Sequence, residues 1–313
     1  MAASSLLANI DTQHEDQIHD CQFDFYGTRL ATASSDKSIR IFEVNGEKTQ
    51  LQTKIQAHES AVWQLSWADP KYGSLLASAS FDKRVLLHQE DANGQWKQVF
   101  CFEDNKTSVN CVQFAPPEFG LILACGSSDG QVTVLESKSQ SGTDWEVTAK
   151  FSALKSGVSS LSWAPPAESG SLFDEPYSDE KKKKNVKRLV CSGNNSTIHV
   201  YEEEEFGQWK LCKELDGHKD WVRCVAWAPS TGRKRNVIAS CDHHGEVRIW
   251  TKETGADWEH VTLQKYNYPI WDVSWSVTGN LLSVSGGDNN VTVWRQMADG
   301  EWACILDQGE QTN

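Results

Sequence analysis

The stretch SSDKSIRIF, residues 34–42, recurs five more times along the chain in altered form. The related segments are SFDKRVLLH (80–88), SSDGQVTVL (127–135), GNNSTIHVY (193–201), DHHGEVRIW (242–250) and GGDNNVTVW (286–294). Taking the third residue of each segment as an anchor gives spacings of 46, 47, 66, 49 and 44 residues. Because such self-similarity is typical of repeat architectures, we predict six units, the fourth enlarged by an insertion at 168–187.

Each unit is predicted to contain four strands. An alternating apolar segment precedes every anchor by about 20 residues, as in VWQLSWAD (62–69), and alternation of this kind indicates a half-buried strand. A second strand runs up to the anchor and a third follows it. The fourth begins in five units at a recurring tryptophan: Trp96, Trp145, Trp209, Trp258 and Trp302.

A four-stranded meander of about 45 residues matches the period of a propeller blade. We therefore predict an all-β, six-bladed β-propeller that occupies the whole chain, 1–313, as one domain. The predicted blades are 14–58, 58–105, 105–153, 154–218, 218–265 and 266–307, preceded by an N-terminal strand at 5–10.

The strand at 5–10, SLLANI, is left over once six complete blades have been counted. The last unit already has four strands, and only six residues follow Asp307. The leftover strand can lie idle, add a fifth strand to the sixth blade, or edge a seventh blade that lacks its other strands. An idle apolar edge is disfavoured in soluble proteins, but the count leaves the other two outcomes open, and six blades can also close a ring.

Histidine and aspartate recur at fixed places in the units. His14, His58 and His218 precede the first strand, and the turn between the second and third strands holds Asp36, Asp82, Asp129 and Asp288, with Asn195 and His244 at the equivalent positions. A reaction needs one site and not a copy in several blades, whereas a buried hydrogen bond satisfies both groups and fixes the turn. We therefore expect a structural role and no catalytic, cofactor-binding or metal-binding residues. The adjacent pair His243–His244 is likewise expected to serve a turn and not a metal.

Composition narrows the functional class further. The formal charge of −13 argues against general nucleic-acid binding, which needs a basic surface. We see neither a run of 18 apolar residues nor a secretory signal near Met1. The nine cysteines form no CxxC pair and mostly lie inside apolar runs, so buried, reduced thiols are expected. The run KKKKNVKR (181–188) follows an acidic stretch and is interpreted as a surface loop more readily than as a nuclear-targeting or phosphate-binding patch.

The histidine–aspartate–aromatic pattern resembles the WD-repeat family, although only Trp250 and Trp294 keep the tryptophan at the end of the third strand. Longer stretches narrow the resemblance to the Sec-thirteen family of small WD-repeat propellers. They are HEDQIHD (14–20), FYGTRLATASSDKSIRIF (25–42), YGSLLASASFDKRV (72–85), FGLILACGSSDG (119–130), DWVRCVAWAPS (220–230) and VSGGDNNVTVW (284–294). The likeness covers all six units.

This resemblance implies a non-enzymatic scaffold of the COPII outer coat, which carries ER-to-Golgi transport, and of the nuclear pore Y complex. In that family the propeller is open, and an α-helical rod protein, either the large coat subunit or a nucleoporin, donates a seventh blade. The implied locations are the cytoplasmic face of the ER membrane and the nuclear envelope, with no direct nucleic-acid contact and no membrane insertion. The partner-binding residues expected from the leftover strand are Leu6, Leu7, Ala8, Asn9 and Ile10.

Two other functional classes stay open at this point. A peptide-recognition adaptor, such as a substrate receptor of a ubiquitin ligase, would read motifs on one face of the propeller, yet no arginine repeats at one equivalent position in the blades. A propeller enzyme would need convergent acids or metal ligands in its channel, and the sequence offers none beyond the repeated pair.

Overall fold

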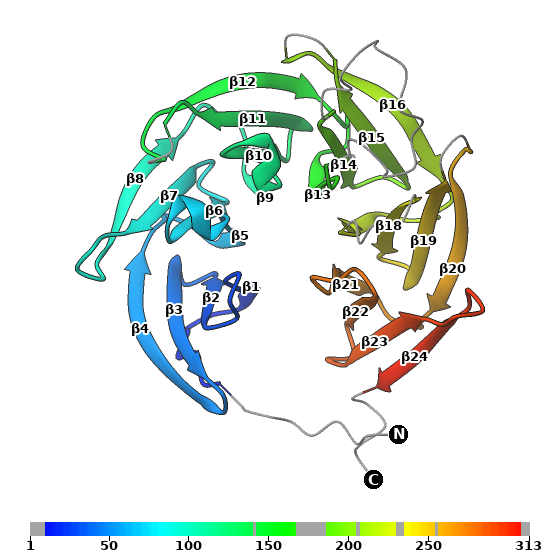
Figure 1. Ribbon diagram of the computed structural model, residues 1–313, viewed down its shortest axis with the longest axis horizontal. Helices are drawn as coiled ribbons and strands as arrows, with labels where there is room; N and C mark the ends of the chain where they lie inside the picture. Colours follow the sequence, from blue (N-terminus) through cyan, green and yellow to red (C-terminus); the bar gives the residue numbers. More distant parts are fainter. Residues whose placement is uncertain are drawn as a thin grey trace, which may run out of the picture. The chain divides into compact units, whose positions relative to one another are not determined.

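The computed structural model describes residues 10–139, 142–166, 186–204, 207–229, 235–253 and 256–307. In these ranges the chain forms six four-stranded sheets in which consecutive strands are neighbours (Figure 1). The sheets are the six predicted blades, so the all-β, six-bladed fold class is confirmed. A seventh blade from a partner remains a prediction.

The chain divides into two compact units, residues 1–158 and 159–313, and the first contains three blades. Blade 1 consists of β1 (Ile18–Phe23), β2 (Arg29–Ser34), β3 (Ser38–Asn45) and β4 (Lys48–Gln56). Blade 2 consists of β5 (Val62–Trp67), β6 (Leu75–Ser80), β7 (Val85–Glu90) and β8 (Trp96–Phe102), with a 3-10 turn η1 at Pro70–Tyr72. Blade 3 consists of β9 (Val109–Phe114), β10 (Ile122–Ser127), β11 (Gln131–Ser137) and β12 (Trp145–Ser152), with η2 at Pro117–Phe119.

The second unit contains the other three blades. Blade 4 consists of β13 (Val158–Trp163), β14 (Arg188–Gly193), β15 (Thr197–Glu203) and β16 (Trp209–Asp216). Blade 5 consists of β17 (Val222–Trp227), β18 (Arg235–Asp242), β19 (Glu246–Glu253) and β20 (Glu259–Lys265). Blade 6 consists of β21 (Ile270–Trp275), β22 (Leu281–Gly286), β23 (Val291–Gln296) and β24 (Trp302–Asp307). The predicted insertion at 168–187 lies outside the described residues except for its last two positions.

Burial within each blade follows from the position of the strand. The second and third strands have neighbours on both faces, and in blade 2 every residue of β6 is buried. The fourth strand faces solvent on one side, so β4 alternates between exposed and partly buried residues along its whole length. Apolar side chains of one blade pack against the next blade: Ile39 and Ile41 of β3 share a core cluster with Val62 and Leu65 of β5.

The turn between the second and third strands explains the residue that follows each anchor aspartate. This residue adopts positive φ at Lys37 (70°), Lys83 (74°), Gly130 (83°) and Asn289 (63°). Positive φ is tolerated by few residues other than glycine and asparagine. Two constraints require glycine at position 130. Its φ is positive, and an added Cβ would lie 1.5 Å from the carbonyl oxygen of Leu154.

The recurring tryptophans pair with the aromatic residue that ends the first strand of the same blade. The ring centroids lie 5.7 Å apart for Trp67–Trp96, 5.8 Å for Trp163–Trp209, and 5.9 Å for both Trp227–Trp258 and Trp275–Trp302. The geometry is edge-on or tilted, which aromatic quadrupoles prefer. Blade 1 has Lys48 where β4 begins, so Phe23 at the end of β1 has no such partner ring.

None of the nine cysteines, all of which lie in the described ranges, forms a disulfide. The sequence predicted buried thiols, but burial is confirmed only for Cys111, Cys125, Cys191 and Cys241, whereas Cys21, Cys212 and Cys304 are exposed. Burial raises the pKa of Cys125 and of Cys191 to about 12, so these two side chains act as small apolar core groups. No helix in the described part of the chain is long and apolar enough to cross a membrane.

One buried histidine of the fold should make stability depend on pH. His88 takes the place of the tryptophan in blade 2 and is buried, and its Nδ1 has no partner among the described residues. Burial first, and the proximity of His58 second, lower the pKa of His88 to about 4. Below pH 6.5 the unfolded chain therefore takes up a proton that the folded chain refuses until pH falls to about 4, so stability is lost as pH falls through this window.

We expect the free energy of unfolding to drop by about 2 kcal/mol from this residue between pH 7.5 and pH 5. Guanidinium unfolding at the two pH values measures the drop, and His88→Leu should flatten it by that amount. His244→Leu, at an exposed histidine of a turn, is the matched control. An identical pH dependence in wild type and His88→Leu would contradict the assignment.

Candidate functional site

Three histidine–aspartate pairs link a loop to a turn within one blade. Nδ1 of His14 lies 2.8 Å from Oδ2 of Asp36, and Nδ1 of His58 lies 2.9 Å from Oδ2 of Asp82. The other ring nitrogen contacts a hydroxyl of the second strand, Thr32 or Ser78, at 2.8 Å. Each pair therefore joins the segment before the first strand to the second strand and to the following turn.

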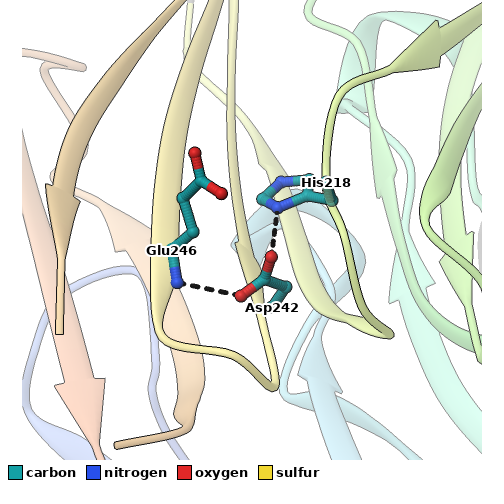
Figure 2. A group of neighbouring side chains, drawn as sticks. All are labelled: His218, Asp242 and Glu246. Atoms are coloured by element: carbon teal, nitrogen blue, oxygen red, sulfur yellow. Dashed lines mark hydrogen bonds and ion pairs between the residues drawn. The ribbon is translucent and has the colours of Figure 1, made fainter. Parts of the chain in front are cut away.

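In the third pair the carboxylate comes from a different position. His244 occupies the anchor position, as the sequence predicted, and the following Gly245 has positive φ (85°). His218 nevertheless contacts Asp242, with Nδ1 to Oδ2 at 2.8 Å (Figure 2). Asp242 is the last residue of β18 and aligns with Ser34, two residues before the anchor. The spacing from the histidine carries the missing signal: it is 24 residues for this pair and also for His58–Asp82.

The remaining anchors use other hydrogen bonds. Oδ1 of Asp129 accepts the hydroxyl of Ser127 at 2.5 Å, and the side chain of Asp288 accepts the backbone and the side-chain N–H of Asn290 at 3.1 and 2.8 Å. Asn195 donates to the hydroxyl of Thr197 at 2.6 Å. No histidine among the described residues contacts these three anchors, so the same turn is closed in two different ways.

The aspartate of each pair is kept ionised by the groups that donate hydrogen bonds to it. Burial alone would raise the pKa of Asp82, but hydrogen bonds from the ring of His58 and from the backbone of Glu59 and Arg84 lower it to about 2. The pKa values of Asp36 and Asp242 are lowered by similar hydrogen bonds that outweigh burial. A carboxylate held ionised by its neighbours is a poor proton acceptor near neutral pH, which matches a structural role better than general-base chemistry.

The buried cluster His218, Asp242 and Glu246 has the composition of a metal site, and its ligand atoms lie within 4.8 Å of one another (Figure 2). Hydrogen bonds already use these atoms. Nε2 of His218 contacts the hydroxyl of Ser240 at 2.7 Å, and Oε1 of Glu246 accepts from Arg248 and Thr262, both at 3.0 Å. The network accounts for the cluster without an ion.

Contacts between neighbouring blades follow one repeated polar rule. The first strand of each sheet is an edge, so its outward N–H groups need acceptors from elsewhere. In the compact unit 1–158, Oε1 of Gln64 in blade 2 accepts the N–H of Val112 in blade 3 at 2.8 Å. In the compact unit 159–313, the hydroxyls of Ser160 and Ser162 in blade 4 accept the N–H groups of Val225 and Trp227 in blade 5 at 3.2 and 3.0 Å. In blades 2, 3 and 5 the preceding blade thus covers the first strand with polar acceptors.

Blade 1 and blade 6 each have a face on which this rule is not fulfilled. In blade 1, Phe23 stands at the position of Phe114, yet 54 % of Phe23 is exposed compared with 8 % of Phe114. In blade 6, Asp272 and Ser274 stand at the positions of the buried acceptors Ser160 and Ser162, yet both are exposed. We call these two surfaces the end faces. Phe25 and Tyr26, an exposed edge-to-face ring pair, extend the end face of blade 1.

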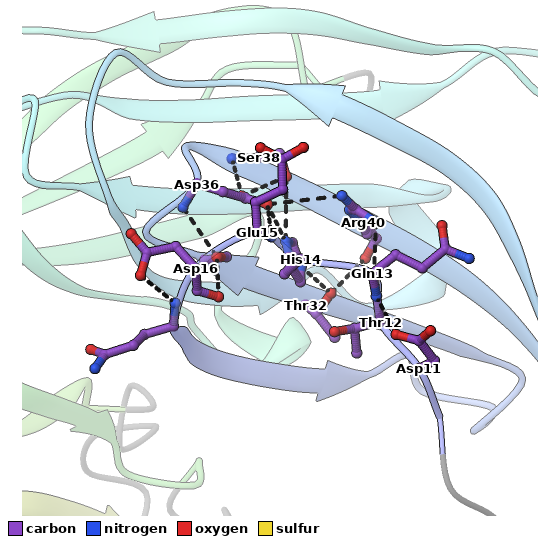
Figure 3. Close-up of polar contacts among 12 residues, drawn as sticks. Asp11, Thr12, Gln13, His14, Glu15, Asp16, Thr32, Asp36, Ser38 and Arg40 are labelled. Carbon is purple, nitrogen blue, oxygen red and sulfur yellow. Dashed lines mark hydrogen bonds and ion pairs between the residues drawn. The ribbon is translucent and has the colours of Figure 1, made fainter.

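The segment before β1 is fastened to β2, to β3 and to the turn between them (Figure 3). Nη1 of Arg40 donates to the carbonyl oxygen of Thr12 at 2.9 Å, and the N–H of Glu15 donates to Oδ2 of Asp36 at 3.2 Å. Of the predicted partner-binding residues, Leu6, Leu7, Ala8 and Asn9 lie outside the described residues. Ile10 is described, is partly buried and lies outside the strands. The segment 12–15 is therefore part of blade 1.

Comparisons with known proteins identify relatives over the full chain. The family model "WD domain, G-beta repeat" matches residues 6–43, 49–89, 209–251 and 260–295. A human protein named "Protein SEC13 homolog" is 46 % identical over 305 residues, which is 97 % of this chain and 93 % of that protein. The "Protein transport protein sec13" of Emericella nidulans is 40 % identical over 318 residues, 98 % of this chain and 99 % of that protein. The Drosophila melanogaster "Protein SEC13 homolog" is 40 % identical over 302 residues, 96 % of this chain and 83 % of that protein.

A search of solved structures adds a likeness of fold alone. A chain in a structure entitled "Crystal Structure of Mitotic Checkpoint Complex" superimposes with a TM-score of 0.69 at 18 % sequence identity. The match covers 91 % of this chain and 76 % of that chain.

The histidine–aspartate pairs lead to a stability prediction. Asp82→Ala should lower the free energy of unfolding by about 1–3 kcal/mol, because it leaves the ring of His58 buried without its partner. Guanidinium unfolding measures the loss. Asp129→Ala is the matched control and should cost less, since no described histidine depends on Asp129. A variant that kept its full stability while losing a specific activity would refute the structural role.

Proposed function

Since this chain belongs to the Sec13 family of WD-repeat proteins, we propose that it is a non-enzymatic scaffold subunit of a protein-transport coat. We assign it to the outer cage of the COPII coat, peripheral to the cytoplasmic face of the ER membrane, and to the scaffold of the nuclear pore as a second assembly. Its partner in the first is the α-helical rod subunit of the coat, and in the second a nucleoporin with a similar helical domain.

The observation that carries this proposal is the pair of end faces. Interior blades bury the first strand of the next blade under polar acceptors and apolar side chains. The end faces leave the corresponding groups in water, with large apolar side chains such as Phe23 among them. Exposed sheet edges and apolar patches of this kind mark sites where another chain binds.

The repeated rule between blades also states what the partner must supply. A blade inserted after blade 6 would present N–H groups of its own first strand to Asp272 and Ser274, as Val225 and Trp227 do to Ser160 and Ser162. On its other side it would present polar acceptors and an apolar surface to β1 and Phe23. Binding of this type is β-augmentation, in which main-chain hydrogen bonds give affinity and alternate side chains give specificity.

The N-terminal residues fit the same interface. The contacts of Thr12, His14 and Glu15 fix the chain on blade 1 immediately after residues 5–10. We propose that residues 5–10 form the outer strand of the composite seventh blade and pair with strands of the rod protein. Obligate interfaces of this type bury roughly 2,000 Å² or more in total and are largely apolar.

The net charge agrees with this assignment. At −13 the chain lacks the basic surface of a nucleic-acid-binding protein, so its place at the nuclear pore would rest on protein contacts. The lysine-rich run at 181–184 lies outside the described residues and plays no part in the proposal.

We expect a substitution at the end face of blade 1 to weaken partner binding selectively. Phe23→Ser removes an exposed ring from the proposed interface and should reduce copurification of a co-expressed rod segment, whereas Phe81→Ser should leave it unchanged. The control is well matched, because Phe23 is 54 % and Phe81 56 % exposed. Equal amounts of rod segment bound to both variants would argue against a blade inserted beside blade 1.

The free chain should be less stable than the complex. Exposed end faces favour aggregation, and co-expression with the blade-donating segment should raise the melting temperature by mass action on the folded state. Thermal melts and size-exclusion chromatography of the chain with and without the segment measure both effects. If the free chain were monodisperse and its melting temperature did not change when the segment was added, the proposal of an inserted seventh blade would be contradicted.

Residues 5–10 should change their protection on binding. Amide hydrogen exchange in this stretch is expected to be fast in the free chain and slow in the complex, and deletion of residues 1–10 should weaken the complex while the six blades stay folded. Ala8→Pro removes one ladder donor and should have a smaller effect of the same sign, with Ala2→Pro as control. Equal protection in both states would mean that the strand pairs within its own chain.

A further inference from the structure

An arginine held between two exposed tryptophans lies where blades 5 and 6 adjoin. The guanidinium carbon of Arg223 lies 5.6 Å from the ring centroid of Trp221 and 5.4 Å from that of Trp271. Nη2 of Arg223 contacts Nδ1 of His243 at 3.2 Å, and the His243 ring lies 6.3 and 6.0 Å from the two indoles. We call these four residues the Trp–Arg patch; all of them belong to the second compact unit.

The fold does not require these side chains. Arg223 and Trp271 are the second residues of β17 and β21, and the same position holds Asn110 in β9 and Ser159 in β13. Small polar residues are therefore enough to build this part of a blade. The tryptophans are also costly to leave in water, with 47 % of Trp221 and 49 % of Trp271 exposed.

The charge of Arg223 is not balanced within the described residues. No described carboxylate forms an ion pair with it, and its buried Nε has no described hydrogen-bond partner. The carboxylates that adjoin the two tryptophans in the sequence bind other groups: Oδ1 of Asp220 accepts the N–H of Trp221 at 2.7 Å, and Oδ1 of Asp272 accepts the thiol of Cys224 at 3.0 Å. An unpaired cation stands out in a chain with 43 acidic and 30 basic residues.

We propose that the Trp–Arg patch binds an acidic peptide segment of a partner protein, at a site separate from the end faces. Stacking on two rings holds the guanidinium plane in place, and a fixed guanidinium is suited to bind a carboxylate through two parallel hydrogen bonds. The exposed faces of Trp221 and Trp271 then cover apolar side chains that flank the acidic residue. Tryptophan and arginine are the residues most enriched at the energetic centres of protein interfaces.

The ligand follows from the chemistry of the patch. A single pinned cation between apolar faces favours one aspartate or glutamate beside aliphatic or proline residues over a long acidic run, which would be repelled by the net charge of −13. The patch would give the scaffold a second point of attachment that does not depend on an inserted blade. Only the tertiary structure reveals this patch. No arginine repeats at one position of the blades, but packing places a single arginine between tryptophans of two neighbouring blades.

Selection from a random 12-residue peptide library by mRNA display, on immobilised full-length chain, tests the proposal. Parallel selections use wild type and Arg223→Gln. Peptides enriched on wild type alone should carry an aspartate or glutamate next to apolar residues. Identical peptide pools from the two proteins, or patch-dependent peptides without an acidic residue, would overturn the proposal.

Fluorescence anisotropy with the best selected peptide then measures the contribution of each group. Arg223→Gln and Trp271→Ala should each weaken binding by about tenfold or more, and Arg84→Gln, at an exposed arginine of blade 2, should have no effect. Replacing the acidic residue of the peptide by its amide should cost as much on wild type and nothing further on Arg223→Gln. Equal losses on both proteins would show that the carboxylate does not meet Arg223.

Melting temperatures show whether each variant is still folded. Arg223→Lys keeps the charge but not the planar fork, so it should melt like wild type and still bind the peptide more weakly than wild type. Undiminished binding by Arg223→Lys would contradict recognition by a guanidinium–carboxylate pair.

Discussion

In blades 2, 3 and 5 the first strand is an edge strand whose outward N–H groups are accepted by side chains of the blade before it. Gln64 of blade 2 accepts the N–H of Val112 in blade 3, and Ser160 of blade 4 accepts the N–H of Val225 in blade 5. Because each blade depends on its neighbour, the array is stable in the interior and incomplete wherever a neighbour is lacking. Phe23 of blade 1 and Asp272 and Ser274 of blade 6 stand at the corresponding positions and are exposed, which supports the proposal that a partner covers them. A protein built in this way has a reason to be a subunit of a larger assembly.

Within a blade, the histidine–aspartate pair is one of several ways to close the same turn. His14, His58 and His218 each bind a carboxylate and a hydroxyl of the second strand, whereas Asp129 relies on Ser127 and Asn195 on Thr197. In blades 1, 2, 3 and 6 the turn combines an aspartate that accepts the backbone N–H two residues on with a following residue at positive φ. Variation in the partner is therefore compatible with one fold, and the pairs need no catalytic explanation.

The two proposed binding surfaces rest on different physics. The end faces present main-chain edges and apolar side chains, which suit an obligate partner that adds a blade. The Trp–Arg patch presents one fixed cation between exposed rings, which suits a short, exchangeable segment. A scaffold with both surfaces would hold one partner permanently and meet another transiently.

The sequence by itself determined the repeat, the six four-stranded units and the strand order, because period-two alternation and the anchor turn are local patterns that each unit repeats. It also placed His14 with Asp36 and His58 with Asp82 in the right blades. It did not find Asp242, because this carboxylate stands two residues before the anchor of its blade and only the contact with His218 reveals its role. Nor could it show that Phe23 is exposed while Phe114 is buried, or that Arg223 lies between Trp221 and Trp271. These facts depend on which blade lies against which face, and that is decided by packing between segments about 50 residues apart, beyond the reach of any local pattern.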